Sequence, residues 1–329
     1  MKRVSSGMRP TGKLHLGNYF GALKNWIELQ DKYECFYFIV DYHALTTKYE
    51  ESKEIRNNIY EMALDWFSMG LDYKKSTIYL QSDIIEIPIL HLIFSMIVPM
   101  PWLERNPTVK EMIRDLDLKE NVGYGLLGYP VLQSADILIV KGEYVPVGKD
   151  QLPHLEFSRE LARRFNYLYG EYFPEPQPLL TETPIILGTD GRKMSKSLNN
   201  QINLSDSKEE MIEKISQMVT DPEKIRKNDP GHPEICSVFT YYGYFDREKE
   251  DIVKKECKSG ERGCVQCKKE IAIKIYELFE SYRDKKSELE KEKDTIWDIL
   301  KEGGKRVKKI TQETLEGVKK LMGLDYLWI

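Results

Sequence analysis

Short apolar runs alternate with longer helical segments through the first half of the sequence, and this alternation most constrains the fold. Three runs have the length and apolarity of strands: residues 2–8, 35–40 and 76–81. Two helical segments separate them: residues 17–31 and 52–70. Ser52 is the predicted N-cap of the second helix and Gly70 its predicted stop. This order predicts an α/β fold with a parallel sheet and right-handed crossovers.

The pattern changes after about Leu204. Strand-like runs nearly disappear, and long segments rich in Lys and Glu take over, with apolar residues at helical spacing such as Ile271, Ile275 and Leu278. We therefore expect two domains, an α/β domain at residues 1–200 and a mostly helical domain at residues 201–329.

Composition excludes some classes of protein. The net charge is −4, which excludes a uniformly basic nucleic-acid coat but not a local basic face. No apolar run approaches the roughly 20 residues of a membrane-spanning helix, and residues 85–100, the longest candidate, contain an acid and His91 and predict a buried helix. The first residues, "MKRVSSGMRP", lack the apolar core of a secretory signal. We expect a cytoplasmic protein without membrane contact.

Residues 7–19, "GMRPTGKLHLGNY", lie between the first strand and the first helix. Gly12 and Gly17 allow the backbone to approach a ligand closely, and the following helix offers free N–H groups to an anion. His15 and Asn18 fall in the first turn, where their side chains can reach phosphate oxygens. An ordinary glycine-containing turn explains the same residues, so this segment alone leaves both interpretations open.

A second segment, residues 188–200 ("GTDGRKMSKSLNN"), has no apolar periodicity and places Lys193 and Lys196 among Gly, Ser and Asn. A mobile loop that carries point charges to a pyrophosphate leaving group has this composition. A solvated basic loop is the alternative, and most such runs are of that kind.

Together the two segments resemble the paired signatures of class I aminoacyl-tRNA synthetases. "HLGN" (residues 15–18) resembles the HIGH motif, and "KMSKS" (residues 193–197) matches the second signature, in the order typical of the class. The resemblance implies a Rossmann-type fold with ATP at the carboxyl ends of the strands.

The segment after residue 122 bears on the choice of amino acid. In a helix, Tyr129, Gln133 and Asp136 share one face, because they are four and then three residues apart. An indole has one polar atom, an N–H that only donates, so a specific pocket needs one acceptor among apolar walls, and Asp136 could supply it. A helix that merely exposes polar residues is the alternative. Pro130 favours that alternative or a helix that starts there.

Within its class, the chain resembles the tryptophanyl-tRNA synthetase family. The resemblance covers residues 3–164 and the KMSKS loop, and it is carried by "GMRPTG", "CFYFIVDYHALTT", "GYGLLGYPVLQSADILIV", "YVPVGKDQLPH" and "GRKMSKS". The tyrosyl-tRNA synthetases, which share the architecture, are the nearest alternative. Two more alternatives are an RNA-binding paralogue without catalysis, disfavoured by the intact motifs, and a nucleotidyltransferase with another substrate, disfavoured by the helical second domain.

The resemblance implies roles for individual residues. It implies catalytic roles, through contacts to ATP and its triphosphate, for four residues: His15, Asn18, Lys193 and Lys196. Further ATP contacts are implied at Arg9, Gly17, Lys110, Gly148, Asp150 and Ser195. Tryptophan contacts are implied at His43, Tyr129, Gln133, Asp136 and Gln151. Among these, Tyr129 and Gln151 would bind the ammonium group, and Asp136 would accept the indole N–H.

The implied reaction has two steps. The carboxylate of L-tryptophan attacks the α-phosphorus of ATP, which gives tryptophanyl-adenylate and pyrophosphate, and a ribose hydroxyl of tRNA(Trp) then takes the tryptophanyl group. Because a carboxylate is already a nucleophile at neutral pH, the protein's task is positioning and charge stabilisation. Mg²⁺ accompanies ATP, held mainly by phosphates and water. The family also implies a homodimer, a catalytic domain at residues 1–200 and a tRNA anticodon-binding domain at residues 201–329.

Four of the five cysteines fall in the predicted second domain, with the spacing C-x20-C-x6-C-x2-C: Cys236, Cys257, Cys264 and Cys267. The fifth, Cys35, begins an apolar strand and predicts core packing. Disulfides are rare in a reducing cytosol, so four thiols predict a metal site, and unrelated buried thiols are the alternative. The spacing leaves both Zn²⁺ and an iron–sulfur cluster open as the metal group. A bacterial branch of the family has a four-cysteine [4Fe-4S] site with the same last two intervals, and resemblance to that branch implies the cluster here.

Basic residues surround this cysteine segment and recur near the C-terminus. They are Lys254, Lys255, Lys258, Arg262, Lys268 and Lys269, and Lys305, Arg306, Lys308 and Lys309. Solvated helix faces explain them, and a surface for the tRNA anticodon arm is the functional hypothesis.

Overall fold

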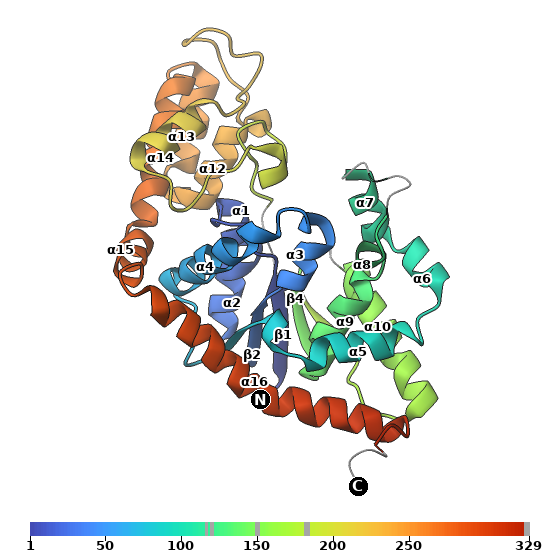
Figure 1. Cartoon of the computed structure of the whole chain (residues 1–329). Helices are drawn as coiled ribbons and strands as arrows, with labels where there is room; N and C mark the ends of the chain where they lie inside the picture. Colours follow the sequence, from blue (N-terminus) through green and yellow to red (C-terminus); the bar gives the residue numbers. More distant parts are fainter. Residues whose placement is uncertain (116–117, 119–121, 149–151, 181–184, 326–329) are drawn as a thin grey trace. The chain divides into compact units, whose positions relative to one another are not determined.

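The computed structural model describes residues 1–115, 118, 122–148, 152–180 and 185–325 (Figure 1). Its contacts divide the chain into two compact units. Unit 1 contains Met1–Gly12, Asn25–Glu182 and Leu289–Ile329, and unit 2 contains Lys13–Lys24 and Thr183–Glu288. The units therefore do not follow the expected division at residue 200, because residues 13–24 group with unit 2 and residues 289–329 with unit 1. The division into a catalytic and a tRNA-binding domain stays a prediction.

Unit 1 is built on a five-stranded parallel sheet with the strand order β3-β2-β1-β4-β5. The strands are β1 (Arg3–Met8), β2 (Glu34–Ile39), β3 (Thr77–Leu80), β4 (Tyr144–Val147) and β5 (Gln177–Leu180). The α/β class is thus confirmed, and β1, β2 and β3 lie where the sequence predicted strands. The strand order reverses beside β1, and ligands of such sheets bind outside the carboxyl ends of the strands at this point.

Helices lie between and around these strands (Figure 1). Those wholly or mainly in unit 1 are α2 (Lys24–Leu29), α3 (Asp41–Lys48), α4 (Ser52–Met69), α5 (Glu86–Ser95), α6 (Met100–Arg105), α7 (Pro107–Asp115), α8 (Tyr124–Leu127), α9 (Tyr129–Ile139), α10 (Leu152–Tyr169) and α16 (Lys293–Leu321). Ser52 is the first residue of α4 rather than its N-cap, which is Glu51. Gly70 ends the helix as predicted, because its φ of 108° suits glycine.

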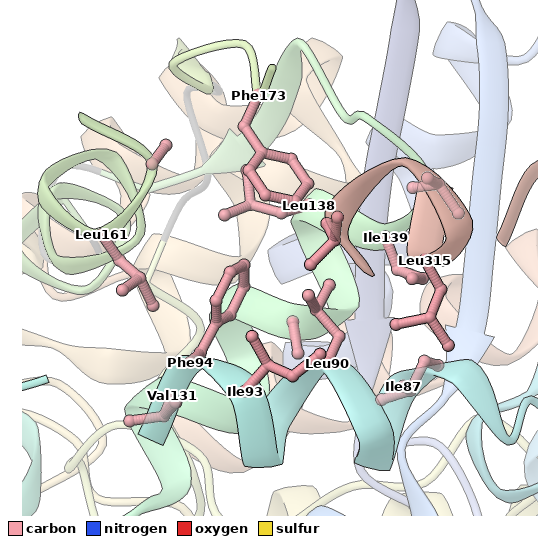
Figure 2. Packing of buried hydrophobic residues seen from close by; sticks show 14 of the residues in the cluster. Ile87, Leu90, Ile93, Phe94, Val131, Leu138, Ile139, Leu161, Phe173 and Leu315 are labelled. Carbon is pink, nitrogen blue, oxygen red and sulfur yellow. The ribbon is translucent and has the colours of Figure 1, made fainter. Parts of the chain in front are cut away.

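The main core of unit 1 lies where α5 packs against α9 (Figure 2). The side chains that fill it include Ile87, Leu90, Ile93 and Phe94 of α5, Val131, Leu138 and Ile139 of α9, Leu161 of α10 and Leu315 of α16. The prediction of a buried helix at residues 85–100 is right for this face only. Leu92 and Met96, on another face, are 56% and 70% exposed.

α16 packs directly along β3. At Gly303 the two backbones are so close that an added Cβ would lie 1.7 Å from the carbonyl oxygen of Ile78. No side chain larger than hydrogen fits there, so Gly303 sets the depth at which α16 supports the strand.

Unit 2 is mostly helical, as the sequence predicted for the region after Leu204. Its helical elements are α1 (Leu16–Asn18), a π-helix (Tyr19–Leu23), α11 (Lys208–Ser216), α12 (Ser237–Phe245), α13 (Arg247–Ser259), α14 (Cys264–Leu278) and most of α15 (Glu280–Leu289). Ile271 and Ile275 of α14 are buried, whereas Leu278 is 49% exposed. Among the described residues of the chain, no helix is long and apolar enough to cross a membrane.

Candidate functional site

Asp136 lies at the centre of a buried polar network in unit 1. α9 begins at Tyr129 with Pro130 in its first turn, as the sequence allowed, and this start places Asp136 two turns along the helix. The carboxylate is 2% exposed. His43 Nε2 of α3 lies 3.0 Å from Asp136 Oδ2, and Gln81 Nε2 donates to Oδ1 at 2.8 Å and to Oδ2 at 2.9 Å.

Burial raises the pKa of Asp136, and hydrogen bonds from His43 and Gln81 oppose that rise by favouring the charged form. His91 contributes a smaller effect in the same direction. Burial also lowers the pKa of His91. Asp136 is therefore surrounded by groups that can donate to it, which keeps its oxygens in the role of acceptors.

Tyr129 is a neighbour in this network, as predicted. Its side chain is buried, its ring lies against that of His43 at 5.5 Å between centroids, and its hydroxyl is hydrogen-bonded to Thr108. Gln133, one turn along α9, is half-buried. Three of the predicted tryptophan residues, His43, Tyr129 and Asp136, are thus brought together, while Gln151 lies outside the described residues.

Sequence reasoning did not single out Gln81, which is fully buried in the 3₁₀ turn (Gln81–Asp83) after β3. A polar residue directly after a buried strand, at the carboxyl edge where ligands bind, was the signal that could have found it. The guanidinium of Arg9, a predicted ATP contact, donates to the His43 carbonyl at 2.6 Å and to Thr46 Oγ1 at 2.9 Å. Its predicted contact with ATP is not tested by these bonds.

A second group of predicted residues lies in unit 2, around the "HLGN" segment. His15 Nδ1 accepts a hydrogen bond from the Asn18 backbone N–H at 3.3 Å, and Asn18 Oδ1 accepts from the His15 N–H at 3.2 Å. These bonds occupy one acceptor on each side chain. The remaining polar atoms are His15 Nε2 and Asn18 Nδ2, and both are hydrogen-bond donors in the neutral protein.

The "HLGN" and "KMSKS" segments are neighbours within unit 2. The backbone N–H of Leu16 donates to the Ile202 carbonyl at 3.0 Å, and His15 forms an isolated antiparallel bridge with Asn203. Burial lowers the pKa of His15 to about 4, with a further contribution from the positive charge of Lys196. Gly17 is required here, because an added Cβ would lie 2.9 Å from His15 Nδ1.

The "KMSKS" loop exposes charged side chains to solvent, and a buried side chain is hydrogen-bonded to its backbone. Lys193 is exposed, Lys196 is partly exposed, and Met194 between them is buried. The buried Asn200 accepts from the Ser195 N–H at 2.7 Å and donates to Asp190 Oδ1 at 2.7 Å. That bond, together with bonds from Arg192, lowers the pKa of Asp190 to about 2. Asn200 therefore acts as an internal brace that the sequence analysis did not identify.

The other predicted ATP contacts are less informative. Gly148 directly follows β4, at the carboxyl edge of the sheet in unit 1. Lys110 is exposed on α7. Asp150 lies outside the described residues. The proposed roles of these three residues stay predictions.

Four cysteines of unit 2 line a single pocket: Cys236, Cys257, Cys264 and Cys267. Burial raises the pKa of Cys236 and Cys257, and neighbouring cysteines contribute in the same direction. In the part of the chain that the structure describes, however, no three His, Cys, Asp or Glu side chains form a group that could hold a metal ion. The structure thus shows that the four cysteines line one pocket, but it does not show them arranged as metal ligands. Cys35 is buried in β2, which agrees with core packing.

Arg262 does not belong to the expected basic surface. Its side chain is 7% exposed, it pairs with Glu256 at 2.6 Å and with Glu270, and it lines the cysteine pocket. Two paired carboxylates explain how a guanidinium can be buried there. Lys268 is partly buried and donates to the Ser216 carbonyl at 2.8 Å. In unit 1, Arg306 of α16 donates to the Tyr73 carbonyl at 2.6 Å.

Comparisons with known proteins agree on one family. The family model "tRNA synthetases class I (W and Y)" matches residues 1–280. The chain is 45% identical to the tryptophan–tRNA ligase of Aquifex aeolicus and 45% identical to that of Thermotoga maritima, and each match covers 98% of this chain and 100% of the relative. Among solved structures, the tryptophanyl-tRNA synthetase from Campylobacter jejuni complexed with ADP and tryptophan has a TM-score of 0.88 at 35% identity, with 98% of this chain and 100% of that chain covered.

Proposed function

The chain belongs to the class I tRNA synthetases for tryptophan and tyrosine and acts as a tryptophan–tRNA ligase, and on this premise we propose how its residues divide the work. The enzyme joins L-tryptophan to tRNA(Trp) in two steps, through tryptophanyl-adenylate with release of pyrophosphate. One group of residues recognises the indole and the other acts on the triphosphate.

Asp136 is the residue that recognises the indole. The observation that supports this role is the position of its carboxylate, which is buried and hydrogen-bonded by the side-chain nitrogens of His43 and Gln81. A carboxylate in such a position can accept a further hydrogen bond from the indole N–H. Tyrosine offers a hydroxyl, which can donate or accept, whereas the indole N–H can only donate. Smaller apolar amino acids leave one buried acceptor position of Asp136 unpaired, and the cost of that missing hydrogen bond supplies the selectivity.

His15, Lys193 and Lys196 act on the triphosphate. Since the pKa of His15 is lowered to about 4, the imidazole is neutral near pH 7. Its Nδ1 accepts from a backbone N–H, so the proton resides on Nε2, which can donate to a phosphate oxygen. Lys193 and Lys196 supply positive charge as negative charge develops on the leaving pyrophosphate. Mg²⁺ arrives with ATP and adds further charge neutralisation.

Amino-acid-dependent exchange of pyrophosphate into ATP tests the activation step. We expect exchange with L-tryptophan and at most trace exchange with L-tyrosine. Equal exchange with both amino acids would support a tyrosyl or mixed specificity. No exchange with either, together with intact tRNA binding, would support an RNA-binding paralogue without catalysis.

The four cysteines of unit 2 hold a [4Fe-4S] cluster in this proposal, with Zn²⁺ as the second candidate. The support is that all four sulfurs line one pocket, since both groups take four thiolates. Binding of the metal group would deprotonate the four thiols and bring them together as ligands, an arrangement that the described residues do not show by themselves. The group would fix the turn between α13 and α14, away from any role in the chemistry.

Absorption spectra and metal analysis of anaerobically purified protein test this proposal. A cluster gives broad visible absorption and about four irons per chain, whereas Zn²⁺ gives a colourless protein. The variant Cys264→Ser should lose the metal, and Cys35→Ser, in a buried strand of unit 1, should keep it. A colourless and metal-free wild-type protein would contradict the proposal.

The exposed and partly buried lysines of α13 and α14 bind the backbone of the tRNA anticodon arm in this proposal. Phosphate contacts of this kind depend on positive charge and weaken with salt. Lys268→Glu should raise the KM for tRNA(Trp) several-fold and leave pyrophosphate exchange unchanged. Lys208→Glu on α11, an exposed lysine of the same unit, is the matched control. Equal loss of both activities in Lys268→Glu would contradict the proposal.

Homodimerisation is the last element of the proposal. Its support is an exposed apolar patch at the end of α5, where Leu92 and the C-cap residue Met96 lie one turn apart and are 56% and 70% exposed. A second copy of the chain would cover this patch. Leu92→Lys should convert a dimer into a monomer in analytical ultracentrifugation. A wild-type protein that sediments as a monomer at micromolar concentration would exclude the dimer.

A further inference from the structure

Gln81 is a buried amide that connects three elements of unit 1. It is 0% exposed in the turn that follows β3. Its Oε1 accepts from the backbone N–H of Tyr42 in α3 at 3.1 Å, and its Nε2 donates to both oxygens of Asp136 in α9. A single side chain thus links the loop after one strand, the helix after its neighbour and the carboxylate of the pocket.

The orientation of this amide is fixed by chemistry. A backbone N–H can only donate, so the atom of Gln81 that faces Tyr42 must be the oxygen. The NH₂ group then faces Asp136 and can only donate. The reversed amide would place two donors together at Tyr42, whose N–H would keep only its bond to Asp41 Oδ1 at 3.1 Å, and two acceptors together at the buried Asp136, where an unmade hydrogen bond is costly.

This orientation determines what Asp136 can offer to a ligand. A carboxylate has about four lone-pair positions. In the described part of the chain, Gln81 occupies one on each oxygen and His43, when its proton is on Nε2, occupies a second on Oδ2. One position on Oδ1 is left, and it is an acceptor.

We propose that Gln81 is a positioning residue that determines specificity, because its oriented amide holds Asp136 as an acceptor for the indole N–H. The inference rests on the proposed role of Asp136 and goes beyond it, since it assigns the fixed polarity of the pocket to a residue that itself does not touch tryptophan. A ligand that places a donor at Oδ1 completes the network. A ligand without a donor leaves a buried acceptor unpaired.

The test compares L-tryptophan with 3-(3-benzothienyl)-L-alanine, in which sulfur replaces the indole N–H. The readout is the ratio of kcat/KM values in pyrophosphate exchange. Wild-type enzyme should prefer tryptophan by at least about 10³-fold, because a site built around a hydrogen bond rejects the analogue that lacks it. Gln81→Met, which keeps the length of the side chain, should lower this ratio by about 10- to 100-fold. The KM for ATP should change less than about threefold.

Gln30→Met is the matched control. Gln30 is also a buried amide of unit 1 that bridges backbone groups, since its Nε2 donates to the Gly70 carbonyl at 3.3 Å and its Oε1 accepts from the Asp72 N–H at 2.9 Å. It has no contact with Asp136. Both variants should lower the Tm, and only Gln81→Met should change the tryptophan-to-analogue ratio.

Gln81→Glu provides a second test that keeps the shape of the side chain. Its carboxylate would still accept from Tyr42 but would place an acceptor against Asp136, where two like charges repel. The KM for tryptophan should rise by more than in Gln81→Met, and the rise should be larger at pH 8.5 than at pH 6, where a shared proton relieves the repulsion.

The outcomes separate the two proposals. If wild-type enzyme does not discriminate against the analogue, the role of Asp136 is wrong. If wild-type enzyme discriminates, and Gln81→Met retains the full ratio while its Tm falls as in Gln30→Met, then Asp136 recognises the indole and the role of Gln81 is wrong.

Discussion

The two groups of functional residues use opposite physical designs. Around Asp136 in unit 1, the polar atoms are buried and hydrogen-bonded to one another. In the "KMSKS" loop of unit 2, Lys193 is exposed and the fixed element is the backbone, held by Asn200. The difference fits the ligands proposed for the two groups. A hydrogen bond to a neutral N–H contributes to specificity mainly where water is excluded and cannot replace it. A triphosphate requires positive charges that are accessible to solvent and counter-ions.

The largest effect is expected from removing the charges of the loop. The double variant Lys193→Ala/Lys196→Ala should lower kcat for pyrophosphate exchange by about 10³-fold, because each lysine stabilises charge that develops in the transition state. Tryptophan binding, measured by calorimetry without ATP, should stay within about twofold. Lys208→Ala, an exposed lysine of the same unit, is the control. If the double variant also loses tryptophan binding, the proposed division of ligands between the Asp136 group and the loop lysines is wrong.

Asp136→Asn tests the buried group. The amide places an NH₂ where the carboxylate accepts from Gln81 and His43, so donors face donors in a buried site. We expect kcat/KM for tryptophan to fall by about 10²-fold and the KM for ATP to stay within about threefold. Asp83→Asn, an exposed carboxylate in the same turn as Gln81, should behave like wild type. A normal KM for tryptophan in Asp136→Asn would contradict indole recognition by this residue.

Asn200→Ala tests whether the loop backbone matters apart from its charges. The variant removes the bonds to the Ser195 N–H and to Asp190, so the loop should lose its fixed shape while both lysines remain. We expect kcat to fall by about 10-fold at unchanged tryptophan affinity.

Asn166→Ala offers a matched control for that variant. In unit 1, Asn166 donates to the Phe173 carbonyl at 2.8 Å and accepts from its N–H at 3.0 Å, a comparable brace in another loop. Its loss should lower the Tm without lowering kcat. If both variants lower kcat equally, loss of stability rather than loop shape explains the effect.

The smallest effect is expected from the titration of His15. Burial lowers its pKa from the ordinary value of 6.5 to about 4, so the unfolded chain binds more protons than the folded chain between these values. The stability that depends on neutral His15 is therefore fully present above about pH 6.5 and is lost as the pH falls towards 4. In His15→Gln, the decline of Tm over this range should be shallower than in wild type. An identical decline in both proteins would show that His15 is not responsible.

Sequence patterns predicted the elements that depend on local signals. The continuous apolar run of β2, the stop at Gly70 and the helix start beside Pro130, which lies in the first turn of α9, are all found where expected, because each depends on neighbouring residues. The motif residues of unit 2 were found because their spacing is distinctive. Gln81 was missed because its partners in α3 and α9 come from distant segments of the chain. Asn200 and the burial of Arg262 were missed although their partners are near in sequence, because residue types alone do not specify which side chains pair within a loop or across a turn. The exposed face of α5 was missed because apolarity alone does not tell a core from an uncovered surface.

The close packing of α16 on β3 has a consequence for the order of synthesis. Residues 293–321 leave the ribosome more than 200 residues after β3, and until then the flank that Gly303 covers is open to solvent. Unit 2 depends mainly on one continuous stretch, Thr183–Glu288, and can become compact earlier. Because β3 leads directly into Gln81, the network of Gln81 and Asp136 gains the support of α16 only when that helix has docked, and contacts of such long sequence separation form slowly.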